Sequence, residues 1–279
     1  MPDYCDLHMH TTCSHGRFSP SRVVELAAGR GLRAIAITDH NNGAGIAEAM
    51  AAGREYGVEV IGGCEFSADW RNAELHVHGL FLDPAHPDFR EVMREADRRW
   101  RARLERMMKL VEKETGIELS WDDIYYTGYN SQVSPVAEAI GKKLGMSTHD
   151  AFHRYIWEGC SCFVAPLVDV AWVAEQAHRL GGVCVMAHAW AYDEEWPRPE
   201  EDFAELAALG VDGIECHHPA HAPEDLERHI ALTRAAGLAV SGGSDCHGAG
   251  PGQEIRMGSL HVPYSVVEEL QERRPSMGQ

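Results

Sequence analysis

The sequence has little that would mark a disulfide-bonded or a membrane protein. Its eight cysteines include no Cys-x-x-Cys pair and no spacing typical of a small disulfide scaffold, so we expect reduced thiols. No apolar run reaches the length of a membrane span, and the first residues lack a basic-then-apolar signal pattern. We therefore expect a cytoplasmic protein with no membrane partner.

Basic residues are also scarce. Lys and Arg number 25 against 43 Asp and Glu, which gives a formal net charge of −18. Such a surface repels polyanions at long range and argues against extended nucleic acid as a partner. A small anionic substrate is still compatible with it where bound cations dominate the local field. The chain of 279 residues is long enough for one large α/β barrel or two ordinary domains, and its composition leaves the oligomeric state open.

Histidine, by contrast, is abundant: the chain has 17. If residues 4–8 begin a strand, His8 and His10 project from the same face, because side chains of a strand alternate. His15 follows in a Ser-His-Gly turn that can fold back toward them. Imidazole is the commonest protein ligand for borderline divalent metals. A surface strand that happens to carry histidines explains this stretch equally well by itself, but similar clusters recur down the chain.

Short apolar runs alternate with helical segments in two parts of the chain. The runs lie at residues 4–8, 34–38, 58–64, 74–82, 182–187, 211–216 and 238–241. Their continuity is typical of buried parallel strands, and we expect a seven-stranded barrel related to the (β/α)8 type. A long charged helical run and an aromatic stretch interrupt the alternation. We predict that residues 1–83 and 166–279 form the barrel and that residues 84–165 are an inserted helical domain covering one mouth.

Most of these strands end in histidine or carboxylate. The strand-end residues are His8, His10, His15, Asp39, His40, Glu65, His76, His188, His217, His218, His221, Asp245 and His247. In a parallel barrel all carboxyl ends lie on one face, so these side chains would converge. Desolvation and repulsion of any charged forms would oppose that packing unless cations were present. The set suits two or three divalent metal ions rather than one.

Several of these residues have a second interpretation. We expect Asp39 to orient a ligand histidine, as a carboxylate commonly does. His78 shares a face with His76 but can simply pack within the strand. His217, His218 and His221 could donate a proton to a leaving group, whereas a structural turn held by Pro219 is the alternative for at least one of them.

Six motifs in order resemble those of the PHP family, the polymerase and histidinol phosphatase superfamily of metal-dependent phosphoesterases. They are Asp6-Leu7-His8-Met9-His10, Thr38-Asp39-His40, Gly63-Cys64-Glu65, Glu74-Leu75-His76-Val77-His78-Gly79, Ala187-His188 and Gly243-Ser244-Asp245-Cys246-His247. The resemblance covers nearly the whole chain. It includes the helical insertion after the fourth strand, which is similar to that of the small phosphoesterases acting on nucleotides and sugar phosphates.

The resemblance implies a distorted (β/α)7 barrel with an inserted small helical domain and a trinuclear metal centre of Mn, Fe or Zn. The ligands it implies are His8, His10, His15, His40, Glu65, His76, His188, Asp245 and His247. It also implies hydrolysis of a small phosphorylated metabolite, in which a hydroxide bridging two metals attacks phosphorus. The catalytic residues that we add to this set are Asp39, His218 and His221.

This sequence departs from the family pattern at three places. The small phosphoesterases usually have aspartate at the position of His15, and a histidine there is more like the histidinol-phosphate phosphatases. An Arg-x-His motif that grips phosphate is missing from the insertion, where residues 131–135 read Ser-Gln-Val-Ser-Pro. The usual Ala-His-Pro is Ala187-His188-Ala189, a minor change. Arg17 and Arg71 are candidates to replace the missing arginine.

We therefore expect a phosphomonoesterase for a nucleotide or sugar phosphate, which could also open a cyclic phosphodiester because a site without that arginine admits a less charged substrate. The alternative enzyme is a histidinol-phosphate phosphatase, which His15 favours. A module that only stores or senses metal is the alternative from another class.

Overall fold

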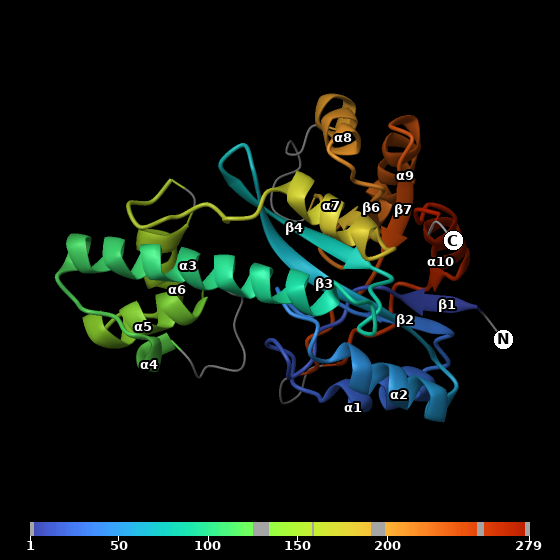
Figure 1. Cartoon of the computed structure of the whole chain (residues 1–279), viewed down its shortest axis with the longest axis horizontal. Coiled ribbons are helices and arrows are strands. Elements are labelled where there is room, and N and C mark those ends of the chain that lie inside the picture. Colours follow the sequence, from blue (N-terminus) through green and yellow to red (C-terminus); the bar gives the residue numbers. More distant parts are fainter. Residues whose placement is uncertain (1–2, 125–133, 158, 191–198, 250–253, 277–279) are drawn as a thin grey trace.

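A computed structural model describes residues 3–124, 134–157, 159–190, 199–249 and 254–276 (Figure 1). Its strands form one eight-stranded sheet in the order β7-β6-β5-β4-β3-β2-β1-β8. The strands are β1 (Tyr4–Asp6), β2 (Ala34–Ile37), β3 (Glu59–Trp70), β4 (Ala73–Leu80), β5 (Val183–Met186), β6 (Gly213–His217), β7 (Ala239–Gly242) and β8 (Val262–Pro263). The expected α/β barrel is confirmed, with a two-residue eighth strand added antiparallel to β1.

The sheet closes almost completely on itself. β1, β2 and β3 are parallel, and so are β5, β6 and β7. Beyond β1 the chain meets the end of β7, where the Leu7 N–H donates to the Gly242 carbonyl over 3.1 Å and Met9 bridges to Cys246. The segments that follow β1 and β7 therefore lie side by side at one rim of the barrel.

The expectation of parallel pairing throughout is wrong at β4, which runs antiparallel to both β3 and β5. β3 does not end before Glu65 but continues to Trp70, and a two-residue loop joins it directly to β4. Arg71 and Asn72 in this loop have φ of 54° and 63°, as in a type I′ hairpin turn. Because β4 runs the opposite way, its first half, including His76, lies at the same rim as the carboxyl ends of β2 and β5.

Helices flank the barrel (Figure 1). They are α1 (Pro20–Gly29), α2 (Ile46–Tyr56), α7 (Val170–Arg179), α8 (Pro199–Ala208), the short 3-10 turn η2 (Pro223–Asp225), α9 (Leu226–Ala235) and α10 (Ser265–Glu272). Local sequence fixes several of their ends. The Ser19 side chain accepts from the Arg22 N–H at the start of α1, and Gly57 ends α2 with φ of 72°.

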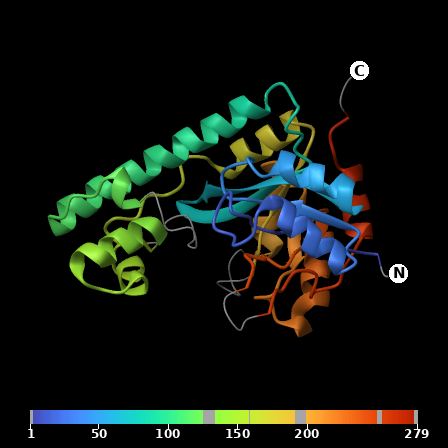
Figure 2. The same ribbon diagram turned by 90° about the horizontal axis from the view of Figure 1, so that it is seen from below.

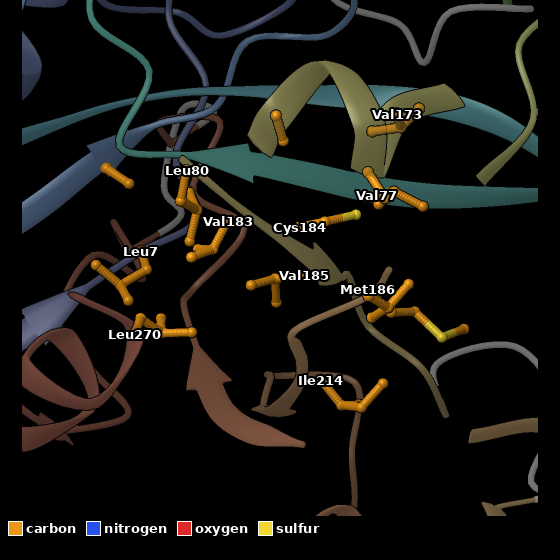
Figure 3. Packing of buried hydrophobic residues seen from close by; sticks show 14 of the residues in the cluster. Leu7, Val77, Leu80, Val173, Val183, Cys184, Val185, Met186, Ile214 and Leu270 are labelled. Atoms are coloured by element: carbon orange, nitrogen blue, oxygen red, sulfur yellow. The ribbon is translucent and has the colours of Figure 1, made fainter. Parts of the chain in front are cut away.

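Two clusters of buried apolar residues hold these layers together. The larger one includes residues of β4, β5, α7 and α10, and Figure 3 shows Val77, Val185, Val173 and Leu270 in it. A second cluster joins α1 and α2 to β2, whose Ala-Ile-Ala-Ile run is fully buried. A strand buried on both faces reads as a continuous apolar run, which is why sequence alone located β2.

The insertion begins with α3 (Phe89–Thr115), a long helix that leaves the barrel and extends well beyond it (Figure 2). Its first half packs against the barrel core through Phe89, Val92 and Ala96. Its second half packs in a separate cluster with the remaining helices of the insertion. Those helices are α4 (Trp121–Ile124), α5 (Ser134–Leu144), α6 (Thr148–Ala151) and the π-helical turn η1 (Phe152–Ile156). Since α3 belongs to both clusters, the domain boundaries at residues 83/84 and 165/166 stay a prediction. None of the described helices is long and apolar enough to cross a membrane.

Candidate metal centre

The nine predicted ligands lie together at one rim of the barrel. They are His8, His10, His15, His40, Glu65, His76, His188, Asp245 and His247, and each contacts at least one other member through the ring or ion-pair contacts given below. They come from β3, β4 and the segments after β1, β2, β5 and β7. The convergence expected from the strand-end pattern is therefore confirmed, while the role of each residue as a ligand stays a prediction.

Glu65 lies at the middle of the cluster and is 1% exposed. One oxygen, Oε2, is 3.3 Å from His8 Nε2, 3.2 Å from His10 Nε2 and 3.2 Å from His40 Nδ1. The other, Oε1, is 3.1 Å from His76 Nδ1 and 3.2 Å from His188 Nε2. One carboxylate thus connects five imidazoles from four segments of the chain.

Asp245 forms the second carboxylate of the cluster and its side chain is 30% exposed. Its Oδ1 lies 3.2 Å from His8 Nε2 and 3.0 Å from His10 Nε2. Asp245 has φ of 48° and His188 has φ of 32°, a backbone conformation that non-glycine residues rarely adopt. Such positions concentrate at functional sites.

His15 occupies the edge of the cluster, as the Ser-His-Gly turn suggested. Its ring stacks on those of His247, His40 and His10, with centroid distances of 4.2, 4.6 and 5.0 Å. Its Nε2 is 3.4 Å from His247 Nε2. The four rings bring their nitrogens close enough to share an ion.

Asp39 holds the loop that carries His15 rather than contacting an imidazole directly. It accepts hydrogen bonds from the Thr11 N–H (2.7 Å), the Thr11 hydroxyl (2.6 Å) and the Ser14 hydroxyl (2.5 Å). The Ser14 hydroxyl lies 3.5 Å from His10 Nδ1. The expected orientation of a ligand histidine by Asp39 is therefore indirect, through the residues of this loop.

Close backbone approach also shapes the rim. Gly243 follows β7 beside β1, and a Cβ at this position would lie 2.3 Å from the His8 backbone nitrogen. Real Cβ atoms do not come so close to backbone, so any other residue would push apart the segments that carry His8 and Asp245.

The donor set fits divalent metal ions. Imidazole nitrogens about 2.0–2.1 Å from one ion lie roughly 3 Å apart at right-angled coordination and about 3.4 Å apart at tetrahedral coordination. The nitrogen pairs His8–His10 and His76–His188 are both 3.2 Å apart. His40 Nδ1 is buried and makes no hydrogen bond in the described structure, although Glu65 Oε2 lies 3.2 Å away. Lone pairs that converge at this spacing, on a mixture of imidazole and carboxylate, favour borderline ions such as Mn, Fe or Zn.

Burial and the neighbouring charged groups shift the pKa values of the histidines in the cluster. Burial opposes protonation of His76, but Glu65 and Glu74 raise its pKa to about 10. Burial likewise opposes protonation of His8, yet Glu215, Asp245 and Glu65 raise its pKa well above the usual value. His15 has the opposite shift, because burial and the neighbouring His10 and His247 lower its pKa to about 2. The raised pKa values of His8 and His76 favour their protonated forms, and a ligand imidazole must lose this proton to bind metal.

Binding of Mn²⁺ should consequently release protons. The raised pKa values of His8 and His76 mean that the metal displaces protons at pH 6, and less so as the pH rises toward those values. We expect the affinity to rise by up to about tenfold per pH unit for each displaced proton between pH 6 and pH 8. Titration calorimetry in buffers of different ionisation enthalpy measures this release. An affinity that is constant with pH, with no protons released, would contradict the expectation.

Of the three histidines at this end of the barrel, His217 is the last residue of β6, and His218 and His221 follow it. His221 uses both ring nitrogens, since Nδ1 donates to the Cys216 carbonyl over 2.9 Å and Nε2 accepts from the Trp190 N–H over 3.3 Å. These bonds occupy both ring nitrogens of His221, so the predicted proton donor has no free ring nitrogen in the described structure, and its role stays a prediction. His218 Nδ1 accepts from the Ala220 N–H over 3.2 Å, and its Nε2 points toward Asp245 Oδ2, 3.7 Å away. His218 is the member of this group that faces the cluster.

Two buried residues of the site were not among the expected ligands. Glu215 on β6 lies 3.1 Å from His8 Nδ1, and a carboxylate inside a buried apolar run was itself a signal, because such a group needs partners. His78 is packed edge-on against His8, with ring centroids 4.2 Å apart, and its Nε2 is 3.8 Å from Glu65 Oε1. His8, His78 and Glu215 form a further group close enough to hold an ion.

The two arginines considered for phosphate binding are placed differently. Arg71 forms ion pairs with Asp202, at 2.7 Å, and with Glu205, so its charge is already compensated. The Arg17 N–H donates to the His247 carbonyl over 2.9 Å, which places this residue beside the cluster. The insertion residues 131–133 lie outside the described residues.

This chain is similar in sequence and fold to known proteins. A model of the PHP domain matches residues 6–133. The 5'-3' exoribonuclease Rnm of Salmonella typhimurium is 30% identical over 269 residues, with 94% of this chain and 90% of the relative covered. A 3',5'-nucleoside bisphosphate phosphatase of Chromobacterium violaceum is 29% identical, with 88% of each chain covered. Among solved structures, a protein of Bifidobacterium adolescentis described as a metal-dependent phosphoesterase has a TM-score of 0.75 at 27% identity, with 99% of each chain covered.

A nearly closed α/β barrel with a rim of imidazoles and carboxylates, together with these similarities, defines a metal-dependent phosphoric ester hydrolase. The chain belongs to the PHP family of such phosphoesterases. The family resemblance of its ordered motifs is therefore confirmed.

Proposed function

We propose that this enzyme hydrolyses the phosphomonoester of a small nucleotide or sugar phosphate. Two or three divalent ions would be held by His8, His10, His15, His40, Glu65, His76, His188, Asp245 and His247. When bound, such ions supply charge for the phosphoryl oxygens and lower the pKa of water. The observation that carries the proposal is the position of Glu65, whose Oε2 faces His10 and His40 while its Oε1 faces His76 and His188, so that one carboxylate can serve neighbouring ions.

A small substrate is favoured over a long nucleic acid by charge. The chain carries a formal net charge of −18, and attraction for a polyanion grows with the number of its phosphates that basic side chains neutralise. The relative from Chromobacterium violaceum is named for a nucleoside bisphosphate, and the relative from Salmonella for an RNA. The first of these substrate classes fits the acidic surface better.

His218 is suited to donate a hydrogen bond or proton to the substrate. Because its Nδ1 accepts from the Ala220 N–H, the neutral ring carries its proton on Nε2. That atom is buried without a hydrogen-bond partner in the described structure and lies beside Asp245. A leaving-group oxygen bound at the cluster would meet this N–H. Of the two candidate arginines, Arg17 is the one whose backbone lies beside the cluster, and its guanidinium donates to the Ala249 carbonyl over 3.5 Å.

Replacement of His218 by asparagine should lower kcat by about 10²-fold, the lower end for loss of general acid catalysis. The metal content should not change, because the ring nitrogen that accepts from Ala220 prevents His218 from acting as a neutral metal ligand through Nε2. Steady-state kinetics and elemental analysis on the same sample test both statements. An unchanged kcat, or a loss of bound metal, would remove His218 from the proposed reaction.

The function itself is tested by phosphate release with Mn²⁺ present. The substrates are a nucleoside 3',5'-bisphosphate, sugar phosphates, a cyclic phosphodiester, histidinol phosphate and a 5'-phosphorylated oligoribonucleotide. We expect the fastest turnover with a nucleotide or sugar monoester, and slower opening of the cyclic diester. Turnover of histidinol phosphate alone would support the phosphatase that His15 suggests. Turnover of the oligoribonucleotide alone would overturn the proposal of a small substrate.

A further inference from the structure

Glu215 is a buried carboxylate on β6 that lies behind the cluster rather than at its centre. It is 1% exposed, and its neighbours on the strand, Ile214 and Cys216, belong to the apolar core on the other face. A carboxylate in such a position is unfavourable unless its oxygens accept hydrogen bonds. Both oxygens of Glu215 have donors within reach, and both donors belong to predicted metal ligands.

The first donor is the ring of His8. Its Nδ1 lies 3.1 Å from Glu215 Oε1 and 3.2 Å from Oε2. A carboxylate at Nδ1 requires the proton there, so the neutral ring presents the lone pair of Nε2. That Nε2 is the atom that faces Glu65 Oε2, at 3.3 Å, and Asp245 Oδ1, at 3.2 Å. Glu215 therefore selects the tautomer of His8 that can bind an ion at the centre of the cluster.

The second donor is the backbone of His188. Its N–H donates to Glu215 Oε2 over 2.7 Å. His188 has φ of 32°, and this strained backbone directs the ring toward Glu65 and His76. A strained conformation persists only where the surroundings hold it in place. One carboxylate from β6 thus fixes two residues, which follow β1 and β5.

We propose that Glu215 is a positioning residue of the metal centre, which sets metal affinity by fixing the tautomer of His8 and the backbone of His188. The inference rests on the proposed function, since it assumes that His8 and His188 bind metal. Although Glu215 lies close enough to His8 and His78 to share an ion with them, the proposal gives it a positioning role, because both of its oxygens face donors that belong to predicted ligands. Carboxylates that hold ligand histidines in this way typically contribute 10–100-fold to metal affinity.

Glutamine at position 215 is the sharpest test. It has the shape of glutamate but only one acceptor oxygen. With that oxygen at the Oε2 position it can still accept from the His188 N–H and lies 3.2 Å from His8 Nδ1, but its NH2 group replaces the nearer acceptor, 3.1 Å from the same nitrogen. The clash of two donors favours the other tautomer, in which Nε2 is protonated and cannot bind metal. We expect Glu215→Gln to bind Mn²⁺ about 10–100-fold more weakly than the unaltered enzyme.

Three measurements separate the possible results. Mn²⁺ binding gives affinity and stoichiometry, ¹⁵N NMR of the Zn²⁺-loaded protein reports the tautomer of His8, and thermal unfolding in EDTA reports the metal-free fold. Glu227→Gln, at an exposed position of α9, is the matched control and should behave like the unaltered enzyme. Weaker binding at unchanged stoichiometry, with a changed His8 signal, supports the proposal. Unchanged affinity overturns it, and so does a loss of one bound ion, which would make Glu215 a ligand.

A second variant, which keeps the negative charge, tests the proposal if Glu215→Gln does not fold. In Glu215→Asp the carboxylate is one methylene shorter and cannot reach both donors, so the affinity should again fall at unchanged stoichiometry. Unchanged affinity in this variant would equally overturn the proposal. If the unaltered enzyme binds no Mn²⁺ at all, the metal site of the proposed function fails instead, and the two failures are therefore distinguishable.

Discussion

Replacement of Asp245 by asparagine is expected to lower kcat/KM for phosphate release by on the order of 10³-fold, the upper range for loss of one charge-stabilising group at a reacting centre. Asp245 Oδ1 lies close to Nε2 of both His8 and His10, and the asparagine removes a negative charge where cations are proposed to bind. The metal content should fall together with activity. Steady-state kinetics on the best substrate of the panel and elemental analysis of the purified variant measure the two effects.

The side chain of Asp245 is 30% exposed, so the variant should fold. Asp122→Asn, at an exposed position of α4, removes the same charge far from the cluster in sequence and should leave both readouts unchanged. A fully active Asp245→Asn enzyme would contradict the proposed ligand set. A protein that binds metal but has no turnover in either form would instead be the storage or sensing module that the sequence also allowed.

The cluster could be predicted from sequence because it follows from a general rule of barrels. Residues after parallel strands share one rim, so His40 after β2 and His188 after β5 could be placed together without any contact information. The prediction of a parallel strand was wrong for β4, although His76 lies at the expected rim. Arg71-Asn72 lacks the glycine that usually marks a two-residue hairpin, so nothing in the sequence signalled that β3 would turn back directly into β4.

The hydrogen-bond partners of individual side chains, in contrast, could not be predicted from the sequence. His218 and His221 are three residues apart after the same strand, and residue type and spacing do not distinguish them. Their hydrogen bonds do, because Trp190 and Cys216 occupy both nitrogens of His221 while His218 keeps Nε2 toward Asp245. Glu215 was not predicted for the same reason. Its contact with His8 Nδ1 depends on how β6 lies across the barrel from β1, and only the closed fold determines this.

The second large expected effect is a loss of stability, and it concerns Arg103 in the insertion. Arg103 on α3 is 1% exposed, donates to both oxygens of Glu74 on β4 over 3.0 and 2.6 Å, and donates through Nε to the Val164 carbonyl over 2.7 Å. Glu74 in turn lies 3.6 Å from His76 Nε2. Arg103 therefore joins the helix of the insertion to the strand that carries a predicted ligand.

Arg103→Met should lower the free energy of unfolding by about 3–5 kcal/mol, the usual range for removing one partner of a buried ion pair. The methionine retains most of the apolar stem, so the loss arises from the charge left on Glu74 and from the unpaired Val164 carbonyl. Arg98→Met removes the same charge from an exposed position of α3, and its ion pair with Glu95 should contribute at most about 1 kcal/mol. Urea unfolding in EDTA compares the two variants with metal effects removed.

Equal stability of the two variants would show that the Arg103–Glu74 pair does not hold the insertion on the barrel. If instead Arg103→Met alone is destabilised, its Mn²⁺ affinity should fall as well, since Glu74 would then be free to turn away from His76.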